Sequence, residues 1–276
     1  MRTRPDDAPS FVVRPPEHGD APIVVHVPHS ATTLPGDVRA ALLLTDAELA
    51  EELRRMTDHR TEQLASDVGQ HGATRMVNRW SRLAVDPERF LDPSEEEMEA
   101  VGMGAVYTRM SDGRPLRDPA PAHRADLLER HFHPYHAALT ELVGEHLDRH
   151  GRCVLVDLHS YPRVALPYEL HATGPRPEVD IGTDPRHTPA WLRDLVVEVV
   201  SEVGLEHADN SPFAGTFVPT RYLGDHRVSS VMLEVRRDVY LDEATARPHA
   251  GEGRVRSLVT DVVGRLAAAL TEVTPR

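Results

Sequence analysis

The sequence contains no lysine, a single cysteine and few aromatic residues. One cysteine, Cys153, cannot form an intrachain disulfide, and it excludes zinc modules built on several cysteines. No apolar run approaches the roughly 20 residues that a transmembrane helix needs. Disulfide-stabilised, zinc-finger and membrane-spanning classes are therefore excluded, and a globular protein remains.

Acidic side chains outnumber basic ones, which narrows the possible partners. All 31 basic side chains are arginines, and 44 aspartates and glutamates give a formal net charge of −13. Such a charge disfavours a nucleic acid or an anionic membrane as the partner, whereas a small anionic ligand needs only local arginines. The segment MRTRPDDAPSF at the N-terminus lacks the apolar stretch of a signal peptide. We expect a soluble, cytoplasmic monomer or small homo-oligomer.

Strand-like and helix-like segments alternate along the chain. Apolar, β-branched runs predict strands at residues 22–27, 73–80, 153–158 and 229–235, and amphipathic stretches predict helices at residues 46–56, 64–72, 123–149, 189–204 and 253–270. This alternation predicts a single α/β domain with a mixed, mostly parallel central sheet and helices on both faces. Residues 1–20 are rich in proline, aspartate and arginine, which predicts an extended N-terminal arm. The domain itself is expected to span residues 21–276. A division into two domains near residue 120 is disfavoured because no flexible joint occurs there.

One long segment has neither the helical nor the strand-like spacing of hydrophobic residues. Residues 86–122 are rich in proline, glycine and acidic residues. A stretch of this length inside a domain is more typical of a lid or a binding loop than of a simple connection. The helix that follows contains Pro134, which we expect to kink it.

Two of the predicted strands are each followed closely by the dipeptide His-Ser. The sequence reads VHVPHS at residues 25–30 and LVDLHS at residues 155–160. The carboxyl ends of strands line the ligand crevice of open α/β sheets, so His29 and His159 can converge. Each histidine alone is more simply a polar loop residue. Their matched positions instead favour a catalytic zinc site, in which two imidazoles and a carboxylate leave one position open.

The third ligand is expected to be a carboxylate, and Asp58 is the first candidate. It lies at the junction of two helical segments, where the local sequence favours a helix N-cap. His59 and Asp157 are the alternatives. Asp157 lies two residues before His159, on the same side of its strand, and could instead orient that histidine.

A metal hydrolase also needs a proton acceptor, and Glu234 is the best candidate. It lies within the apolar strand VMLEV, where a lone carboxylate is costly unless a charge or a metal compensates it. Such a group takes a proton from water and passes it to the leaving nitrogen. The alternative is a structural ion pair with Arg236 or Arg237.

Arginines and a polar loop are the candidates for substrate binding. Guanidinium groups match carboxylates in a bidentate way, which points to Arg79, Arg82 and Arg89. The polar loop at residues 210–216 could offer the Asn210 side chain or backbone N–H groups to a substrate, or form a simple turn.

Eight motifs occur in a fixed order: PHS (28–30), Asp58, NRWSRLAVDPER (78–89), GAVYTR (104–109), HPYH (133–136), DLHS (157–160), NSPFAGTFVP (210–219) and VMLEVRRDVYLDE (231–243). Single motifs are short, but their joint order is specific. Over roughly residues 22–270, the chain resembles the N-formylglutamate amidohydrolase family. That family is similar to zinc carboxypeptidase-like hydrolases, with a phosphorylase/hydrolase-like α/β fold.

The resemblance implies an activity and a site. The activity is zinc-dependent cleavage of an N-formyl or similar small N-acyl group from an amino acid such as N-formyl-L-glutamate. Zinc would be held by His29, Asp58 and His159, with Glu234 as the base. Arg79 and Arg89 would clamp the substrate's carboxylates. We further expect Asn78, Ser160, Asn210 and Thr216 to contact the substrate.

One motif departs from the family pattern. The usual D-x-N-R reads Asp86-Pro87-Glu88-Arg89 here. The added carboxylate of Glu88 could neutralise Arg89 and shift the preference away from a dianionic glutamate. Two alternatives follow: a metal hydrolase of the same fold acting on another N-acyl amino acid, a small peptide or a biosynthetic intermediate, and a non-enzymatic module that binds a small ligand.

Overall fold

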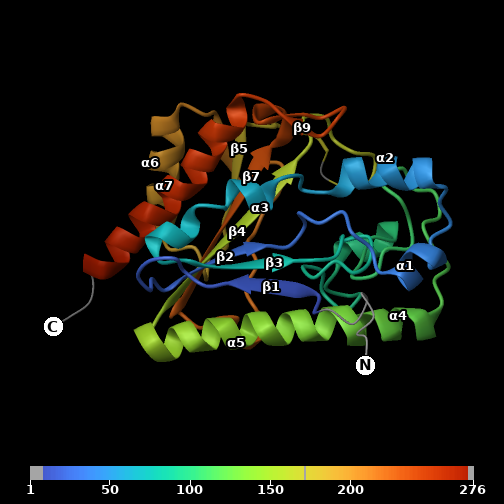
Figure 1. Cartoon of the computed structure of the whole chain (residues 1–276), viewed down its shortest axis with the longest axis horizontal. Helices are drawn as coiled ribbons and strands as arrows, with labels where there is room; N and C mark the ends of the chain where they lie inside the picture. Colours follow the sequence, from blue (N-terminus) through green and yellow to red (C-terminus); the bar gives the residue numbers. More distant parts are fainter. Residues whose placement is uncertain (1–8, 171, 273–276) are drawn as a thin grey trace.

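The computed structural model describes residues 9–170 and 172–272, and its centre is a seven-stranded sheet (Figure 1). In spatial order the strands are β1 (Phe11–Arg14), β3 (Thr74–Asn78), β2 (Ile23–Val27), β4 (Cys153–Tyr161), β7 (Val228–Arg236), β5 (Val179–Gly182) and β6 (His207–Asp209). The central strands β3, β2, β4 and β7 are parallel, whereas β1 is antiparallel to β3 and β5 is antiparallel to β7. Two antiparallel strands of two residues each, β8 (Leu241–Asp242) and β9 (Arg247–Pro248), lie outside this sheet. The predicted mixed, mostly parallel sheet is confirmed.

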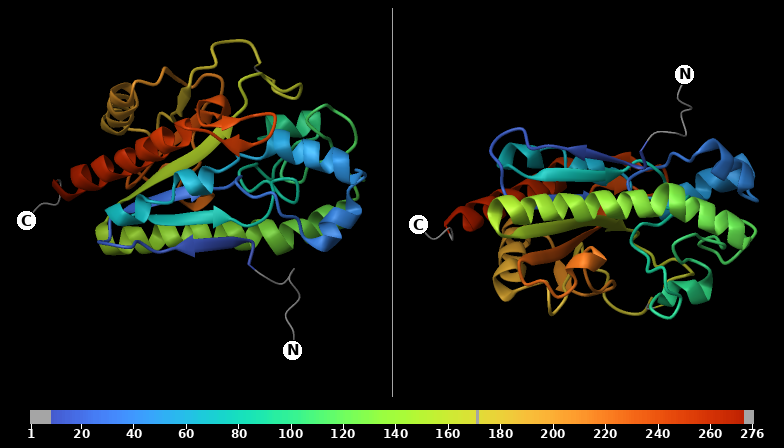
Figure 2. Two further views of the ribbon diagram at one scale, coloured as in Figure 1. Left: turned by 45° about the horizontal axis from the view of Figure 1, so that its top comes forward. Right: turned by 90° about the horizontal axis from the view of Figure 1, so that it is seen from below.

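Helices cover both faces of the sheet, as predicted (Figures 1 and 2). The α-helices are α1 (Gly36–Ala41), α2 (Asp46–Met56), α3 (Thr61–Leu64), α4 (Pro121–Leu127), α5 (His133–His150), α6 (Ala190–Val203) and α7 (Gly251–Glu272). Helix α5 packs on one face, and α3, α6 and α7 pack on the other. The short helices are η2 (Val68–His71), η3 (Glu97–Val101), η4 (Leu128–Phe132), η5 (Thr220–Tyr222) and η6 (Arg237–Val239).

The alternation along β4 positions the polar side chains. Val154, Val156 and Leu158 belong to the core beneath α6 and α7, whereas Cys153 and Leu155 belong to the core beneath α5. Successive strand residues point to opposite faces, so Asp157 and His159 lie on the α5 face. Glu234 pairs in register with His159 from the neighbouring strand β7. Side chains paired in this way share a face, so the sheet itself places a carboxylate beside a histidine.

Local sequence signals set the ends of several helices. Thr45 and Glu48 form a capping box, in which the Thr45 hydroxyl accepts from the Glu48 N–H and the Glu48 carboxylate accepts from the Thr45 N–H. The helix predicted at residues 123–149 is continuous from α4 to α5, but its hydrogen-bonding pattern changes near Pro134. This proline lies in the first turn of α5, directly after the π-helical turn η4. A proline has no N–H to donate to the carbonyl four residues earlier, and that residue, Arg130, lies within the π-helical turn.

Three strands of the seven-stranded sheet were not predicted, nor were the short strands β8 and β9. Strand β1 lies in the segment expected to be an extended arm, of which residues 1–8 fall outside the described residues. Strands β5 and β6 are only four and three residues long. These strands are short and lie at or next to the edges of the sheet, so neither length nor alternation marks them in the sequence.

A buried carboxylate anchors the irregular segment 86–122 to α2. The Glu52 Oε1 accepts a hydrogen bond from the Ser111 N–H at 2.6 Å, and Oε2 accepts one from the Ser111 hydroxyl at 2.8 Å. Glu52 is fully buried, and burial raises the pKa of its carboxyl. The segment is thus held by both oxygens of one side chain.

We expect Glu52→Ala to lower the free energy of unfolding by roughly 1–3 kcal/mol, because a buried N–H loses its acceptor. Urea unfolding followed by circular dichroism measures the change. Glu52→Gln keeps an acceptor for the Ser111 N–H and should be less destabilising. Equal stability of the Ala variant and the wild type would show that Glu52 does not hold the segment.

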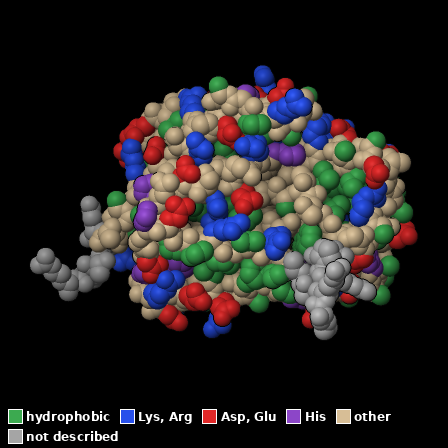
Figure 3. Space-filling view, in the orientation of Figure 1, with side chains coloured by type: hydrophobic (Ala, Val, Ile, Leu, Met, Phe, Trp, Pro, Cys, Tyr) green, Lys and Arg blue, Asp and Glu red, His purple; other side chains and the backbone are tan. Residues whose placement is uncertain are grey.

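Within residues 9–170 and 172–272, none of the helices combines the length and the apolar character needed to cross a bilayer. On the face shown in Figure 3, acidic and basic side chains are interspersed.

Candidate active site

A cavity of about 1030 Å³ lies at the carboxyl ends of β2, β4 and β7. Residues of the irregular segment 86–122 and of the loop 212–218 form two of its walls. The predicted site residues that line it are His29, Asp58, Arg82, Arg89, His159, Ser160, Thr216 and Glu234. The segment 86–122 therefore contributes directly to a binding cavity, and the strand ends meet where the parallel sheet predicts.

His29, Asp58 and His159 converge in this cavity. One ring nitrogen of each histidine and one carboxylate oxygen all lie within 4.8 Å of one another, and all three residues are buried. Asp58 Oδ2 lies 3.1 Å from His159 Nδ1 and 3.6 Å from His29 Nδ1. The two Nδ1 atoms are 3.3 Å apart. The residues predicted to hold zinc thus present three donor atoms to one point.

The opposite ring nitrogen of each histidine faces another carboxylate. His29 Nε2 lies 2.8 Å from Asp86 Oδ1, and His159 Nε2 lies 3.1 Å from Asp157 Oδ1. Such partners fix the orientation of an imidazole that binds a metal through its other nitrogen. Burial alone would raise the pKa of Asp86, but Arg82 and His29 hold it well below its ordinary value. Asp86 therefore remains ionised and can keep His29 in place.

The charges around these ligands fit a divalent cation. The ion pairs made by His29, Asp58 and His159 involve Asp58 itself, Asp86, Glu88, Asp157, Arg82 and Arg237. With neutral histidines, four carboxylates against two guanidiniums leave a formal charge of −2. A charge of this size is costly in a buried site unless it is balanced. Burial lowers the pKa of His29 and His159, but the neighbouring carboxylates raise it overall, so either two imidazolium groups or a divalent cation bound by neutral histidines can balance the charge. Two imidazoles and one carboxylate are also the donor types of catalytic zinc sites.

The Asp58 side chain does not cap a helix. The N-cap residue of α3 is Arg60, and no side chain caps that helix. The Asp58 carboxylate instead faces the histidines, and Arg237 Nη2 donates to its Oδ1 at 3.3 Å. Burial would raise the pKa of Asp58, but hydrogen bonds from His159 and His29 lower it strongly. The local interpretation as a cap is therefore corrected.

The two alternatives for the third ligand are engaged elsewhere. His59 Nε2 lies 3.1 Å from the backbone oxygen of Arg54. Asp157 Oδ1 lies 2.8 Å from His26 Nδ1, and its Oδ2 accepts from the Phe217 N–H at 3.2 Å. Both residues have structural partners, which leaves Asp58 as the better-placed carboxylate.

Glu234 lines the cavity beside His159 with one oxygen free. The side chain is 8% exposed, and among the described residues its Oε2 has no hydrogen-bond partner. Burial raises the pKa of Glu234 to about 8, while the nearby His159 lowers it. The alternative ion pairs are not formed, because Arg236 donates to Asp238 and Arg237 donates to Asp58. Glu234 is therefore a buried carboxyl available to a bound molecule.

The predicted substrate-binding arginines separate into two groups. Arg89 lines the cavity, with Nε 3.4 Å from Asp86 Oδ2 and Nη1 3.6 Å from Glu96 Oε1. Arg82 also lines it and donates to Asp86 Oδ2 at 2.7 Å. Arg79 is exposed and does not line the cavity, so its predicted role is not supported. Proximity along the sequence does not show toward which side a residue at a strand end points.

Two other predicted contacts also lie outside the cavity lining. Asn78 accepts a hydrogen bond from the Trp80 N–H at 3.2 Å. Asn210 accepts from the Thr183 N–H at 2.8 Å and from the Gly215 N–H at 3.2 Å, so it supports its own loop. The turn interpretation of residues 210–216 therefore applies to Asn210. Conversely, Arg186 and Arg237 line the cavity but were not proposed as substrate contacts.

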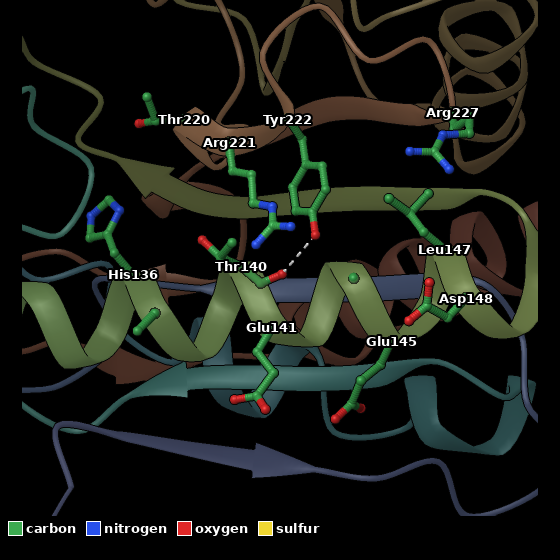
Figure 4. Close-up of a pocket in the computed structure, with 12 residues that line it drawn as sticks. His136, Thr140, Glu141, Glu145, Leu147, Asp148, Thr220, Arg221, Tyr222 and Arg227 are labelled. Atoms are coloured by element: carbon green, nitrogen blue, oxygen red, sulfur yellow. Dashed lines mark hydrogen bonds between the residues drawn. The ribbon is translucent and has the colours of Figure 1, made fainter.

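A second hollow of about 770 Å³ lies between α5 and η5 (Figure 4). Tyr222 bridges its two sides by donating from its hydroxyl to the backbone oxygen of Thr140 at 3.3 Å. Within the described part of the chain, the clusters of potential metal ligands all lie elsewhere. The larger cavity is therefore the candidate active site.

A sequence profile of N-formylglutamate amidohydrolases matches residues 21–241. The chain belongs to the N-formylglutamate amidohydrolase family. The crystal structure of N-formylglutamate amidohydrolase from Ralstonia eutropha JMP134 matches with a TM-score of 0.85 and 26% sequence identity, covering 97% of this chain and 100% of that chain. No curated protein matches significantly.

The gene product Atu2144 from Agrobacterium tumefaciens also shares the fold, with a TM-score of 0.68 and 18% identity over 96% of this chain and 97% of that chain. Family membership confirms the resemblance drawn from the ordered motifs and indicates a hydrolase that acts on an amide bond. It also confirms the single-domain α/β fold. The family assignment and the cavity chemistry point to the same class of reaction.

Proposed function

We propose that the chain is a zinc-dependent amidohydrolase that removes an N-formyl or similar small N-acyl group from an amino acid, with N-formyl-L-glutamate as the first candidate. The supporting observation is that three buried ligand atoms converge in one cavity with Glu234, whose Oε2 has no hydrogen-bond partner among the described residues. His29, Asp58 and His159 would hold the zinc, which supplies a Lewis acid for the acyl oxygen and for water. A cytoplasmic location and a small-molecule partner belong to this proposal.

The side chains of the cavity would divide the remaining work. Glu234 would accept a proton from water and return it to the leaving nitrogen, for which a pKa near neutrality is suited. Arg89 would bind a substrate carboxylate, because its side chain lines the cavity and its two ion pairs, to Asp86 and Glu96, are long at 3.4 and 3.6 Å. Asp86 and Asp157 would hold the two histidines in their orientations.

A formate-release assay tests the proposal. Purified protein should hydrolyse N-formyl amino acids, lose the activity after chelation and dialysis, and regain it when zinc is added. A gain of zinc per chain, measured by elemental analysis, should accompany the return of activity. Full activity in protein shown to be free of metal would overturn the zinc mechanism, and zinc-loaded protein without amidase activity would favour a binding module.

One observation favours a different N-acyl amino acid as the substrate. Glu88 lies close to both histidines, with Oε1 3.3 Å from His159 Nε2 and Oε2 3.5 Å from His29 Nδ1. It is also adjacent in the sequence to Arg89, the proposed anion-binding residue. A second carboxylate on the substrate would meet this charge, and like charges are costly in a desolvated site. A substrate with an uncharged side chain avoids that repulsion.

We expect Glu88→Gln to raise the kcat/KM ratio of N-formylglutamate to N-formylglutamine by about tenfold or more, because the repelling charge is removed at nearly constant size. Steady-state kinetics with both substrates measures the ratio. Glu88→Asp keeps the charge and serves as the matched control. A ratio that stays at the wild-type value in the Gln variant would show that Glu88 does not select against the side-chain carboxylate.

A further inference from the structure

A second cluster of metal-binding residue types lies away from the cavity. His146 and His150 are one turn apart on α5, and Asp20 precedes β2. One ligand atom of each of these residues lies within 4.8 Å of the others. None of the three lines the active-site cavity or the hollow between α5 and η5. The cluster thus joins two separate segments of the chain at a place that the proposed reaction does not use.

His146 is the unusual member of this cluster. It is fully buried, and neither of its ring nitrogens has a hydrogen-bond partner among the described residues. A buried polar group without a partner costs free energy. Burial also lowers the pKa of His146 to about 4, so the imidazole is neutral and has a free lone pair. A neutral imidazole is the form that binds a metal.

His150 and Asp20 complete the arrangement. The His150 ring stacks near that of His146, with the ring centroids 5.8 Å apart. Its Nε2 lies 3.3 Å from Asp20 Oδ2. Two histidines spaced i and i+4 on a helix present their rings on the same side, a spacing found in helical zinc sites. Asp20 is partly exposed, so an ion could enter from solvent.

We propose that Asp20, His146 and His150 form a peripheral binding site for a divalent transition-metal ion, with Zn²⁺ matching the donor set. Two imidazoles and one carboxylate suit zinc, and water can fill the remaining position. The ion fastens the segment before β2 to the end of α5. The site is structural and is independent of the amidohydrolase reaction.

Arg149 competes with the ion for Asp20. Its Nη1 donates to Asp20 Oδ2 at 2.6 Å, and this is the oxygen that faces His150. The ion pair is largely exposed, with 45% and 41% of the two side chains accessible, and exposed pairs are weak. Zinc can therefore displace the guanidinium. Removing Arg149 should strengthen zinc binding, which gives the proposal a directional test.

The test is the zinc stoichiometry of the full chain, measured by titration with zinc alone after chelation and dialysis. Wild-type protein should bind two equivalents, and His150→Gln and Asp20→Asn should each bind one. His133→Gln, an exposed histidine on the same helix, is the matched control and should bind two. Arg149→Gln should lower the Kd of the peripheral site about threefold or more.

The outcomes separate this site from the active site. A His29→Ala/His159→Ala variant should keep one zinc ion at the peripheral site, and adding His150→Gln should remove it. Equal stoichiometry in wild type, His150→Gln and Asp20→Asn would overturn the peripheral site. Failure of the active-site proposal instead appears as full zinc binding in the double alanine variant. Far-UV circular dichroism confirms that each variant is folded.

Discussion

Glu234→Gln is expected to lower kcat roughly 10²–10⁴-fold, the range for loss of a positioned general base. The amide has nearly the same shape as the carboxyl, so the packing in β7 should be retained. The Oε2 atom has no hydrogen-bond partner among the described residues, so the substitution breaks no bond to that oxygen. The loss should therefore fall on turnover rather than on folding or zinc content.

Three measurements on one preparation check this expectation: kcat by formate release, zinc per chain by elemental analysis, and the far-UV circular dichroism spectrum. Glu206→Gln, an exposed glutamate that does not line the cavity, is the control and should keep wild-type kcat. A zinc-loaded Glu234→Gln variant with wild-type kcat would falsify the assignment of the base. Loss of zinc together with activity would instead mean that Glu234 contributes to metal retention.

The strands that hold the site could be predicted because they are buried on both faces. Ile23–Val27 and the first six residues of β4 are continuous apolar runs with only isolated polar residues, which is how central parallel strands appear in a sequence. The rule that parallel strands end at one edge then brings His29 and His159 together. Both steps use information within a few residues of each position.

Contacts between distant segments could not be predicted in the same way. Asp58 and His159 are 101 positions apart, and the local pattern around Asp58 favours a helix cap. Arg79 has the same residue type and neighbourhood as Arg82, yet only Arg82 reaches the cavity. Asn210 is a polar loop residue whose side chain bonds to the backbone N–H groups of Thr183 and Gly215 instead of facing the cavity. Side-chain direction at strand ends and in loops depends on tertiary packing, which short motifs do not encode.

At Glu88 the sequence departs from the family motif, and the structure shows which side chains this carboxylate faces. The sequence alone suggested that Glu88 would affect Arg89. The structure instead places the Glu88 carboxylate within 3.5 Å of ring nitrogens of His26, His29 and His159. The residue therefore bears on the charge of the metal-ligand cluster as well as on substrate selection.

Asp58→Asn is expected to remove most of the zinc bound at the active site, together with the activity, while the far-UV circular dichroism spectrum stays native. An amide oxygen is a weaker ligand than a carboxylate, and the substitution reduces the negative charge of the cluster. Replacing a residue that hydrogen-bonds to a metal ligand lowers metal affinity about 10–100-fold. Loss of a residue that binds the metal directly should therefore lower the zinc affinity at least about 100-fold. Titration of zinc at buffered concentrations measures the affinity.

The structure sharpens the contrast between the two interpretations of Asp58. Asn caps a helix nearly as well as Asp, so a residue that acts only as a cap would lose less than about 1 kcal/mol of stability and keep its zinc. The Asp58 carboxylate contacts both histidines and Arg237 rather than a helix end. His59→Gln is the matched control, since the His59 ring bonds to the Arg54 backbone, and it should keep full zinc content. If Asp58→Asn keeps full zinc and full activity, the third ligand is another residue, first His59 or Asp157. If zinc and activity are lost in Asp58→Asn and retained in His59→Gln, the third ligand is Asp58.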